Sequence, residues 1–172
     1  MTRYVAIDFE TADHGADSAC AVGLVLVEDA RVTASAYHLI RPPRRDFVFT
    51  DLHGIAWDHV KDAPSFGELW PTLGGFLGRG DALVAHNAGF DRAVLRACCK
   101  AADVKPPRQP FVCTVSLARA AWRVYPTRLP DVCRYLAIGL NHHDAASDAH
   151  ACARILIAAL RDGHEPMTAR IR

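Results

Sequence analysis

The sequence predicts one α/β domain built on a mixed β-sheet with helices packed against it. Three β-rich runs come first, and strands then alternate with helices along the rest of the chain. This order is typical of a mixed sheet covered by helices. The 172 residues are 51% hydrophobic and 23% charged, which suits a packed domain and excludes a disordered chain. We therefore expect a single domain over residues 1–172, with a core over about 3–162 and a short polar tail over 163–172.

The first three elements are expected to be strands. Tyr4–Phe9 is short and apolar, Cys20–Glu28 is rich in Val and Leu, and Arg31–Ile40 alternates loosely. The polar pair Glu28–Asp29 lies between the second and third runs and indicates a hairpin. Residues 41–64 contain paired prolines and a glycine, which predict a loop with one short helical turn.

Helices and short strands are expected to alternate over the rest of the chain. Ser65 is followed three residues later by Glu68, a spacing typical of a helix N-cap, and this helix should end at about Leu77. Two short strands and four helices follow: strands at Ala82–Ala85 and 111–114, and helices at about Phe90–Ala102, Val115–Arg123, Leu129–Ala137 and Asp144–Arg161.

The charge balance and the apolar runs limit the classes of function. The formal net charge is +1, so no strong overall field draws the protein to nucleic acid or to a membrane. Contact with a polyanion must then be local or depend on bound cations. Charged residues near the N-terminus argue against a signal peptide, and the longest apolar run, Ala19–Val27, is too short to cross a bilayer. We expect a cytoplasmic protein without membrane contact.

Two acidic residues lie at the end of the first predicted strand. Residues two apart on a strand share a face, so Asp8 and Glu10 point the same way while Val5, Ile7 and Phe9 point the other way. Two neighbouring carboxylates repel each other and lose hydration unless a cation joins them. The alternative is an exposed strand end with solvated acids.

A third acid falls within the apolar stripe of the last predicted helix. At about 100° per residue, Asp148 lies on the same side as Cys152, Ile155 and Ala159. A carboxylate in such a stripe is seldom buried without a partner or a metal ion. The alternative is a structural ion pair with one of the arginines.

Two further titratable residues lie just at the start of predicted helices. Asp91 falls in the turn from a strand into a helix, where the helix dipole favours a carboxylate, so ordinary capping is the alternative function. His143 lies five residues before Asp148 and can act as a base near neutral pH. The alternative for His143 is a surface histidine pair with His142.

In this order, the four acids and the histidine resemble the DEDDh superfamily of 3′→5′ exonucleases. The resemblance is carried by V-A-I-D-F-E-T at 5–11, L-H-G-I at 52–55, H-N-A-G-F-D at 86–91 and H-D-A-A-S-D at 143–148. Their order and spacing are more specific than any one motif. The similarity covers roughly residues 3–160 and is greatest to the exonuclease domain of the DNA polymerase III epsilon subunit and its stand-alone relatives. It implies a ribonuclease H-like α/β fold, a mixed central sheet with helices packed on both faces.

The resemblance also implies a site for two divalent cations, Mg²⁺ or Mn²⁺. Asp8, Glu10 and Asp148 would hold one cation, Asp8 would bridge to the second, and Asp91 would assist through water. Hard cations of this kind suit carboxylate oxygens, and two of them can promote hydrolysis of a phosphodiester. His143 is the implied general base. The residues implied to line the pocket for the last nucleotides are Phe9, Thr11, Ile55, His86, Asn87 and Phe90.

For several of these pocket residues a structural role is the alternative. Phe9, Ile55 and Phe90 are of a type that often lies in the core. Thr11 and Asn87 could instead satisfy backbone groups of loops.

The function that follows is a metal-dependent 3′→5′ exonuclease that releases nucleoside 5′-monophosphates from single-stranded 3′ ends. The 52–55 segment favours DNA over RNA as the substrate. The first alternative is an RNA exonuclease of the oligoribonuclease or RNase T kind, because recognition of the 2′-OH depends on local pocket geometry.

The second alternative is a non-catalytic module associated with a polymerase, which we would expect to have lost a metal ligand, and none of the implied ligands is missing. The sequence ends at Arg172 without the extension by which the epsilon subunit is expected to bind its polymerase. We therefore expect a free-standing repair or turnover exonuclease, and association with a polymerase stays unproven.

Overall fold

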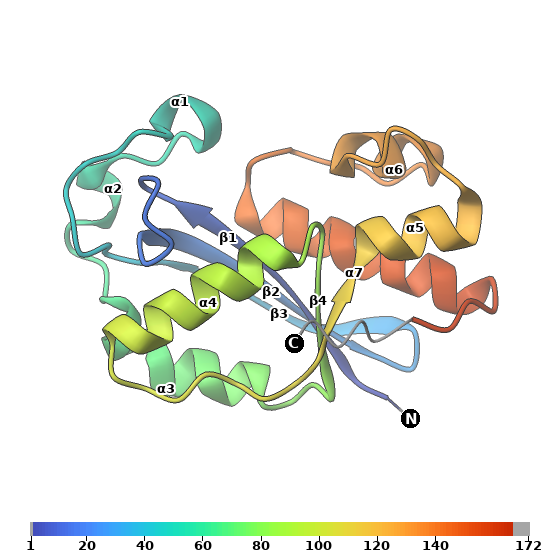
Figure 1. The fold of residues 1–172 in the computed structure, drawn as a ribbon, viewed down its shortest axis with the longest axis horizontal. Coiled ribbons are helices and arrows are strands. Elements are labelled where there is room, and N and C mark those ends of the chain that lie inside the picture. Colours follow the sequence, from blue (N-terminus) through green and yellow to red (C-terminus); the bar gives the residue numbers. More distant parts are fainter. Residues whose placement is uncertain (1, 167–172) are drawn as a thin grey trace.

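The computed structural model describes residues 2–166, and its centre is a five-stranded sheet with helices on both faces (Figure 1). The strands are β1 (Tyr4–Thr11), β2 (Ala19–Glu28), β3 (Arg31–Leu39), β4 (Ala82–Ala85) and β5 (Phe111–Cys113). They follow the order β3-β2-β1-β4-β5, antiparallel from β3 to β1 and parallel from β1 to β5. The mixed sheet that the sequence predicts is therefore confirmed.

The hairpin between β2 and β3 turns at Asp29 and Ala30, whose φ angles are 52° and 53°. Two successive residues with positive φ are typical of a type I′ turn, whose twist matches that of the flanking strands. The predicted hairpin is confirmed. Strand β2 lies between β3 and β1 and is buried along almost its whole length.

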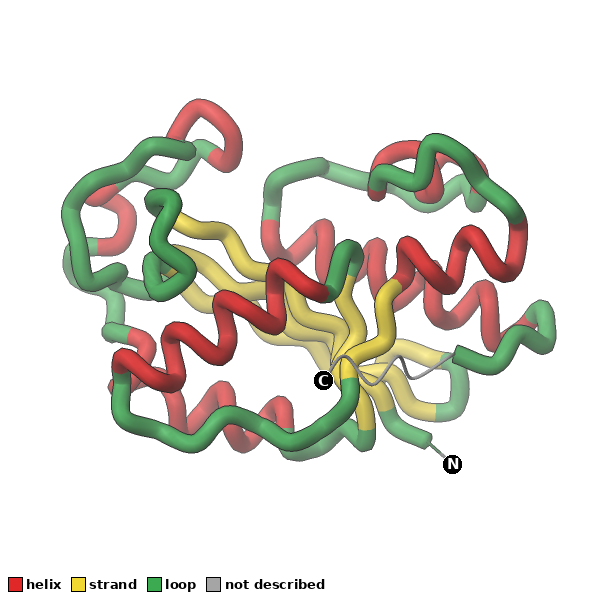
Figure 2. Tube along the Cα trace, in the orientation of Figure 1, coloured by secondary structure: helices red, strands yellow, loops and turns green. Residues whose placement is uncertain are grey.

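One face of the sheet is covered by helices from the last third of the chain: α5 (Thr114–Trp122), α6 (Leu129–Tyr135) and α7 (Ala145–Arg161) (Figures 1 and 2). The apolar stripe predicted for the last helix is buried here, with Cys152, Ile155 and Ala159 packed on the sheet. Burial of this stripe holds α7 across β1 and β2.

The other face is covered by α3 (Phe66–Leu77) and α4 (Gly89–Ala101). Side chains of β1 alternate between the two faces, so that Val5 and Ile7 pack here while Ala6 packs under α7. Strand β1 therefore runs through the middle of the core.

The predicted N-cap at Ser65 is confirmed. The Ser65 hydroxyl accepts a hydrogen bond from the backbone N–H of Glu68 at 3.4 Å, and the Glu68 carboxylate accepts one from the N–H of Ser65 at 2.7 Å. This reciprocal pair is a capping box. The helix ends at Leu77, as the sequence predicts, and the other predicted helices and strands agree to within a few residues.

The prediction for residues 41–64 is wrong in one respect, because the segment contains two short helices rather than one helical turn. They are α1 (Thr50–His53) and α2 (Trp57–Val60). Histidine rings support both: His53 Nδ1 accepts the N–H of Ile55, and His59 Nδ1 accepts the N–H of Ala56, each at 3.0 Å. Such side-chain-to-backbone bonds leave no periodic pattern in the sequence.

The start of α7 lies directly against β2 at Gly23. A Cβ at this position would overlap the backbone carbonyl of Ala145, so only glycine lets the helix come so close. The helix is capped here by the Asp144 carboxylate, which accepts the N–H of Ser147 at 2.8 Å. Gly23 pairs with Asp8 on the neighbouring strand, so this contact brings the first turn of α7 next to Asp8.

That residues 1–172 form a single exonuclease domain stays a prediction. Of the predicted tail at 163–172, residues 167–172 lie outside the described part of the chain. Among the helices of residues 2–166, none is both long enough and apolar enough to span a membrane.

Candidate active site

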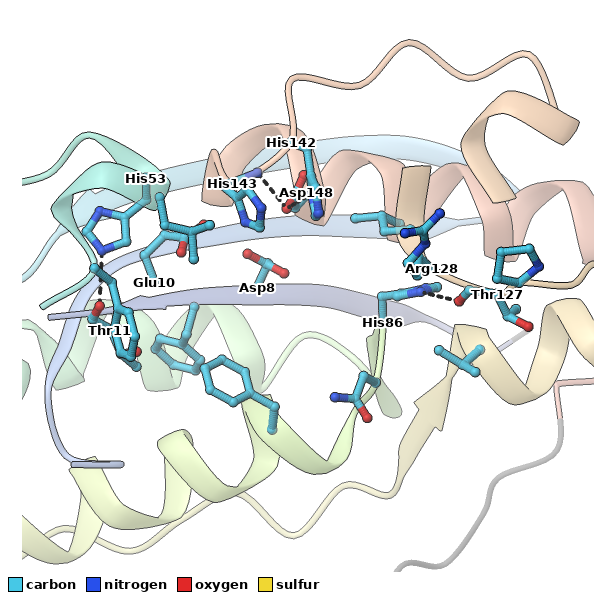
Figure 3. Close-up of a pocket in the computed structure, with 18 of the residues that line it drawn as sticks. Asp8, Glu10, Thr11, His53, His86, Thr127, Arg128, His142, His143 and Asp148 are labelled. Atoms are coloured by element: carbon cyan, nitrogen blue, oxygen red, sulfur yellow. Dashed lines mark hydrogen bonds and ion pairs between the residues drawn. The ribbon is translucent and has the colours of Figure 1, made fainter. Parts of the chain in front are cut away.

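A cavity of about 730 Å³ opens at the carboxyl ends of the parallel strands β1 and β4. Its wall combines the end of β1, the start of α4, the loop before α7 and the connection between α5 and α6. Ligands of α/β proteins commonly bind at the carboxyl edge of the sheet. Figure 3 shows the side chains that line this cavity, several of them polar or charged.

Three carboxylates converge in this cavity. Asp8 and Glu10 come from β1, as their shared strand face predicts, and Asp148 comes from the first turn of α7. One oxygen of each lies within 4.8 Å of the others (Figure 3). Glu10 and Asp148 are only 8% and 4% exposed, so Glu10 is not the solvated acid at a strand end that the alternative requires.

In the described part of the chain, these carboxylates lie close together without a lysine or arginine to balance their charge. Within residues 2–166, none of the ion pairs joins a lysine or an arginine to Asp8, Glu10 or Asp148. The alternative of an arginine partner for Asp148 is therefore not seen in the described residues. Burial, followed by mutual repulsion, raises the pKa of Glu10 to about 7 and that of Asp8 well above its usual value. Burial also raises the pKa of Asp148.

The donor set fits a divalent cation. Oδ1 of Asp148 is buried and has no hydrogen-bond partner among the described residues, an unusual state for a buried acceptor. A bound cation would satisfy this oxygen and offset the repulsion among the three acids. Because Asp8, Glu10 and Asp148 offer only carboxylate oxygens, the site suits a hard ion such as Mg²⁺ or Mn²⁺.

Asp91 lies beneath the wall of the cavity rather than on its surface. It is 1% exposed, and its Oδ1 accepts the backbone N–H of Phe9 at 3.0 Å. This bond ties the first turn of α4 to the end of β1, between Asp8 and Glu10. Burial raises the pKa of Asp91 to about 8. The structure thus brings Asp91 next to the acidic group but leaves it outside the set of three converging oxygens.

His143 lies at the rim of the cavity, above the carboxylates (Figure 3). Its pKa is lowered, first by burial and then by the neighbouring His142, so the imidazole is neutral at pH 7. Its backbone adopts a left-handed conformation with φ 66°, and its N–H donates to Oδ2 of Asp148 at 3.1 Å. This conformation places a neutral imidazole beside the acidic cluster.

His142 also belongs to the site. From the sequence alone, it is considered only as a member of a surface histidine pair. Its ring stacks on that of His143, with 3.8 Å between the ring centroids, and its Nδ1 lies 3.0 Å from Oδ2 of Asp148. Between the two partners of this hydrogen bond, the backbone turns at His143, whose φ angle is left-handed at 66°. No spacing pattern in the sequence reports that turn.

Five of the six predicted pocket residues line the cavity: Phe9, Thr11, His86, Asn87 and Phe90. Phe9 is 3% exposed and packs mainly in the core, whereas Phe90 is 46% exposed at the rim. Ile55 is not among the lining residues and packs with the small apolar cluster around Val60. Leu52 and His53, from the same L-H-G-I segment, line the cavity instead.

His86 has a positioning role in addition to its place in the wall. Its Nε2 donates to the carbonyl of Thr127 at 3.0 Å, and its Nδ1 lies 2.8 Å from the hydroxyl of Thr114. Burial lowers the pKa of His86 to about 4, so the ring stays neutral. The bond to Thr127 holds the loop before α6 against the end of β4, and the bond to Thr114 ties the same strand end to the start of α5.

Sequence reasoning did not find the residues that this loop contributes. They come from a stretch without a recognisable motif and include Tyr125, Pro126, Thr127 and Arg128. The His86–Thr127 hydrogen bond brings the loop to the cavity. A contact between residues 41 positions apart leaves no local signal in the sequence.

The fold and the site together define a DEDDh exonuclease of the ribonuclease H-like class. The sequence profile of the RNase_T exonuclease family matches residues 5–156. The chain therefore belongs to this exonuclease family, which confirms the resemblance seen in the sequence.

Known proteins show the same relationship. DNA polymerase III of the PolC type from Thermotoga petrophila is 29% identical over 158 residues, covering 90% of this chain. The chain spans only 12% of the length of that relative. Exonuclease X in complex with 5′-overhanging duplex DNA superposes with a TM-score of 0.78 at 26% identity, over 99% of this chain and 98% of that one. The nuclease domain of 3′hExo bound to rAMP, a DEDDh family member, has a TM-score of 0.82 at 18% identity, over 96% and 94% of the two chains. The last likeness confirms the fold.

Proposed function

We propose that this protein is a divalent-metal-dependent 3′→5′ exonuclease that acts on single-stranded DNA 3′ ends and releases nucleoside 5′-monophosphates. The observation that carries the proposal is the convergence of Asp8, Glu10 and Asp148 beside a neutral His143 in one cavity. Carboxylates that repel each other, and that pair with no lysine or arginine among residues 2–166, are suited to metal-assisted phosphodiester hydrolysis.

In this proposal, Asp8, Glu10 and Asp148 would hold one cation, and Asp8 would also help to hold a second. When bound, two such cations supply charge stabilisation for the attacking and leaving oxygens of an in-line displacement. Asp91 orients the end of β1 through its bond to the Phe9 N–H, and it would assist the second cation through water. Because Asp8 would serve both cations, its loss should be the most damaging.

His143 is proposed to be the general base. The imidazole is neutral at pH 7 and lies at the rim of the cavity, so it can accept a proton from a water molecule that enters beside the carboxylates. No hydrogen bond joins its ring to another of the described residues, which leaves a ring nitrogen free for that water.

The substrate end is proposed to bind against the aromatic rim. Phe90 and Tyr125 both line the cavity and are 46% and 68% exposed, although neither is needed to close the core. Unpaired bases stack favourably on exposed aromatic rings, whatever their sequence. The rim therefore favours a single-stranded end with splayed bases.

DNA is proposed as the preferred polymer because the L-H-G-I segment resembles that of the DNA sub-group, and two of its residues, Leu52 and His53, line the cavity. The neighbouring structures contain ligands of both kinds, since Exonuclease X is bound to duplex DNA and 3′hExo to rAMP. An RNA exonuclease with the same chemistry is the second candidate, supported by the rAMP complex.

The test uses matched 5′-labelled single-stranded DNA and RNA with Mg²⁺, Mn²⁺ or EDTA. We expect a ladder that shortens from the 3′ end, requires the cation and forms faster on DNA. Asp8→Ala should abolish it, whereas Asp62→Ala, which removes an exposed acid outside the cavity, should not. A folded protein that cleaves neither polymer would contradict the proposal, and faster cleavage of RNA would assign the second candidate.

A further inference from the structure

A second groove, of about 690 Å³, lies between α4 and the chain that leads back into β5. In Figure 1 this returning segment runs alongside α4 toward the edge strand of the sheet. Four of the ten lining residues carry a positive charge, and none carries a negative one. We call this the basic groove, defined by Arg92, Arg96, Lys105 and Arg108.

The four charges of the basic groove are not neutralised within the described part of the chain. None of them belongs to an ion pair among residues 2–166. The whole sequence has a formal net charge of only +1, so this concentration of positive charge is a local feature. Clustered like charges repel one another, and a polyanion that enters the groove relieves this repulsion.

The groove has a firm wall. Three prolines lie in the returning segment, and each restricts the backbone around it. The Gln109 side chain donates to the carbonyls of Leu77 and Gly80, both at 3.2 Å, which anchors the segment to the end of α3. A wall that is already ordered loses less conformational entropy when it binds a ligand.

The basic groove and the catalytic cavity are separated by very short stretches of chain. Phe90 lines the cavity, and Arg92, two residues further along α4, lines the groove. Phe111 lines the groove at the start of β5, and Val115, four residues later, lines the cavity. β5 ends at Cys113 and Val115 already lies in α5, so four residues at no more than about 3.3 Å each keep this second separation below about 13 Å. A strand of several nucleotides can reach both.

We propose that the basic groove binds the phosphodiester backbone of the substrate, several nucleotides upstream of the 3′ end held in the cavity. The inference rests on the proposed function, because it assigns a second contact to the same polymer. Guanidinium groups suit phosphate oxygens through paired hydrogen bonds. The aromatic residue of the groove, Phe111, is 6% exposed, so this contact reads charge and not base identity.

The proposal predicts that substrate length decides the effect of neutralising the groove. Arg96→Gln/Arg108→Gln should lower kcat/KM for a strand of about 30 nucleotides by roughly tenfold or more, while a trinucleotide, which ends within the cavity, is cleaved at nearly the same rate. The slope of log affinity against log salt for the long strand should become shallower by about 1.4, the value for two lost contacts on single-stranded nucleic acid.

The matched control is Arg31→Gln/Arg154→Gln, which removes the same charge from two exposed arginines beside the β2–β3 hairpin and α7. Equal losses in the two double variants would overturn the proposal, because net charge alone would then explain them. An equal loss for the trinucleotide would also overturn it.

A binding measurement separates this inference from the proposed activity. The wild-type protein and both variants are titrated in EDTA against a fluorescent single strand of the same length, with anisotropy as the readout. If the wild type cleaves no strand of any length, the proposed function fails. Weaker binding by Arg96→Gln/Arg108→Gln alone would still support the basic groove, and unchanged binding would overturn it.

Discussion

At the scale of single residues, the adjacent histidines His142 and His143 make different contacts at the site. His143 lines the cavity with a neutral ring, whereas His142 places its Nδ1 3.0 Å from Asp148 and is partly exposed to solvent. The backbone at His143 is left-handed, and the N–H of that residue donates to Asp148. The two histidine rings stack with 3.8 Å between their centroids. Substituting each in turn therefore compares the proposed base, His143, with the residue that positions Asp148, His142.

We expect His143→Ala to lower kcat by about 10²- to 10⁴-fold, the usual contribution of a general base. His142→Ala should cost much less, within about tenfold, because it removes a hydrogen bond to Asp148 and a ring stacked on His143 but leaves the proposed base in place. Calorimetry with Mn²⁺ should show nearly unchanged metal affinity in His143→Ala. Equal kinetic losses in the two variants, or lost metal binding in His143→Ala, would contradict this division of roles.

Some residues of the site can be predicted from the sequence and others cannot. Strand and helix periodicity places Asp8, Glu10 and Asp148 each on a defined face, and the resemblance to the exonuclease family predicts them as one group. His142 and the Thr127 loop could not be predicted, because both reach the site through long-range hydrogen bonds or a left-handed turn. Ile55 illustrates the same limit, since the motif that contains it lines the cavity with Leu52 and His53 instead.

At the scale of secondary-structure elements, the approach of α7 to β2 decides where Asp148 lies. Gly23 pairs with Asp8 and leaves room for the Ala145 carbonyl at the start of α7. The atom that a new side chain would meet belongs to the backbone and cannot rotate away. The strand and helix boundaries could be predicted from local pattern, but this contact could not, because it joins residues that are distant in the sequence.

We expect Gly23→Ala to displace the first turn of α7 and to separate Asp148 from Asp8. Overpacking of this kind costs about 1–3 kcal/mol of stability, and a shift of about 1 Å at a catalytic group can cost about 10²-fold in rate. The Tm of thermal unfolding and the value of kcat/KM should therefore both fall.

The control for this substitution is Gly75→Ala in α3. A Cβ there meets no atom within 4 Å, and alanine favours a helix interior over glycine by about 0.5–1 kcal/mol. This variant should be slightly more stable and fully active. A Gly23→Ala protein with the activity of Gly75→Ala would show that the α7 contact does not position the site.

At the scale of the whole molecule, the site joins segments from both ends of the described chain. The acids of β1 come from its first residues, and Asp148 comes from its last helix, so the cluster exists only when the sheet and α7 are assembled. Burying these acids is unfavourable, which their raised pKa values report. The stability of the fold is therefore coupled to protons and to any cation that the cluster binds.

Without a divalent cation, stability should fall as the pH rises from about 5 to about 8. Burial raises the pKa of Glu10 to about 7 and that of Asp91 to about 8, above the values of an unfolded chain. The folded protein then holds protons that the unfolded chain releases, so stability is complete below the unfolded pKa and is lost as the pH passes through the folded one. Asp13, whose pKa is lowered to about 2 by Arg44, titrates below this range and does not contribute.

Saturating Mg²⁺ should reverse this loss, because it binds the ionised carboxylates and stabilises only the folded state. The increase in Tm on replacing EDTA by Mg²⁺ should thus be small near pH 5 and grow steadily toward pH 8. Scanning calorimetry across this range measures it directly. Asp8→Asn/Glu10→Gln supplies the control: with two ionisable groups removed, the decline in EDTA should become shallower and the Mg²⁺ effect should largely disappear. An Mg²⁺ shift that is independent of pH, or one that persists in the double variant, would place the cation elsewhere on the molecule.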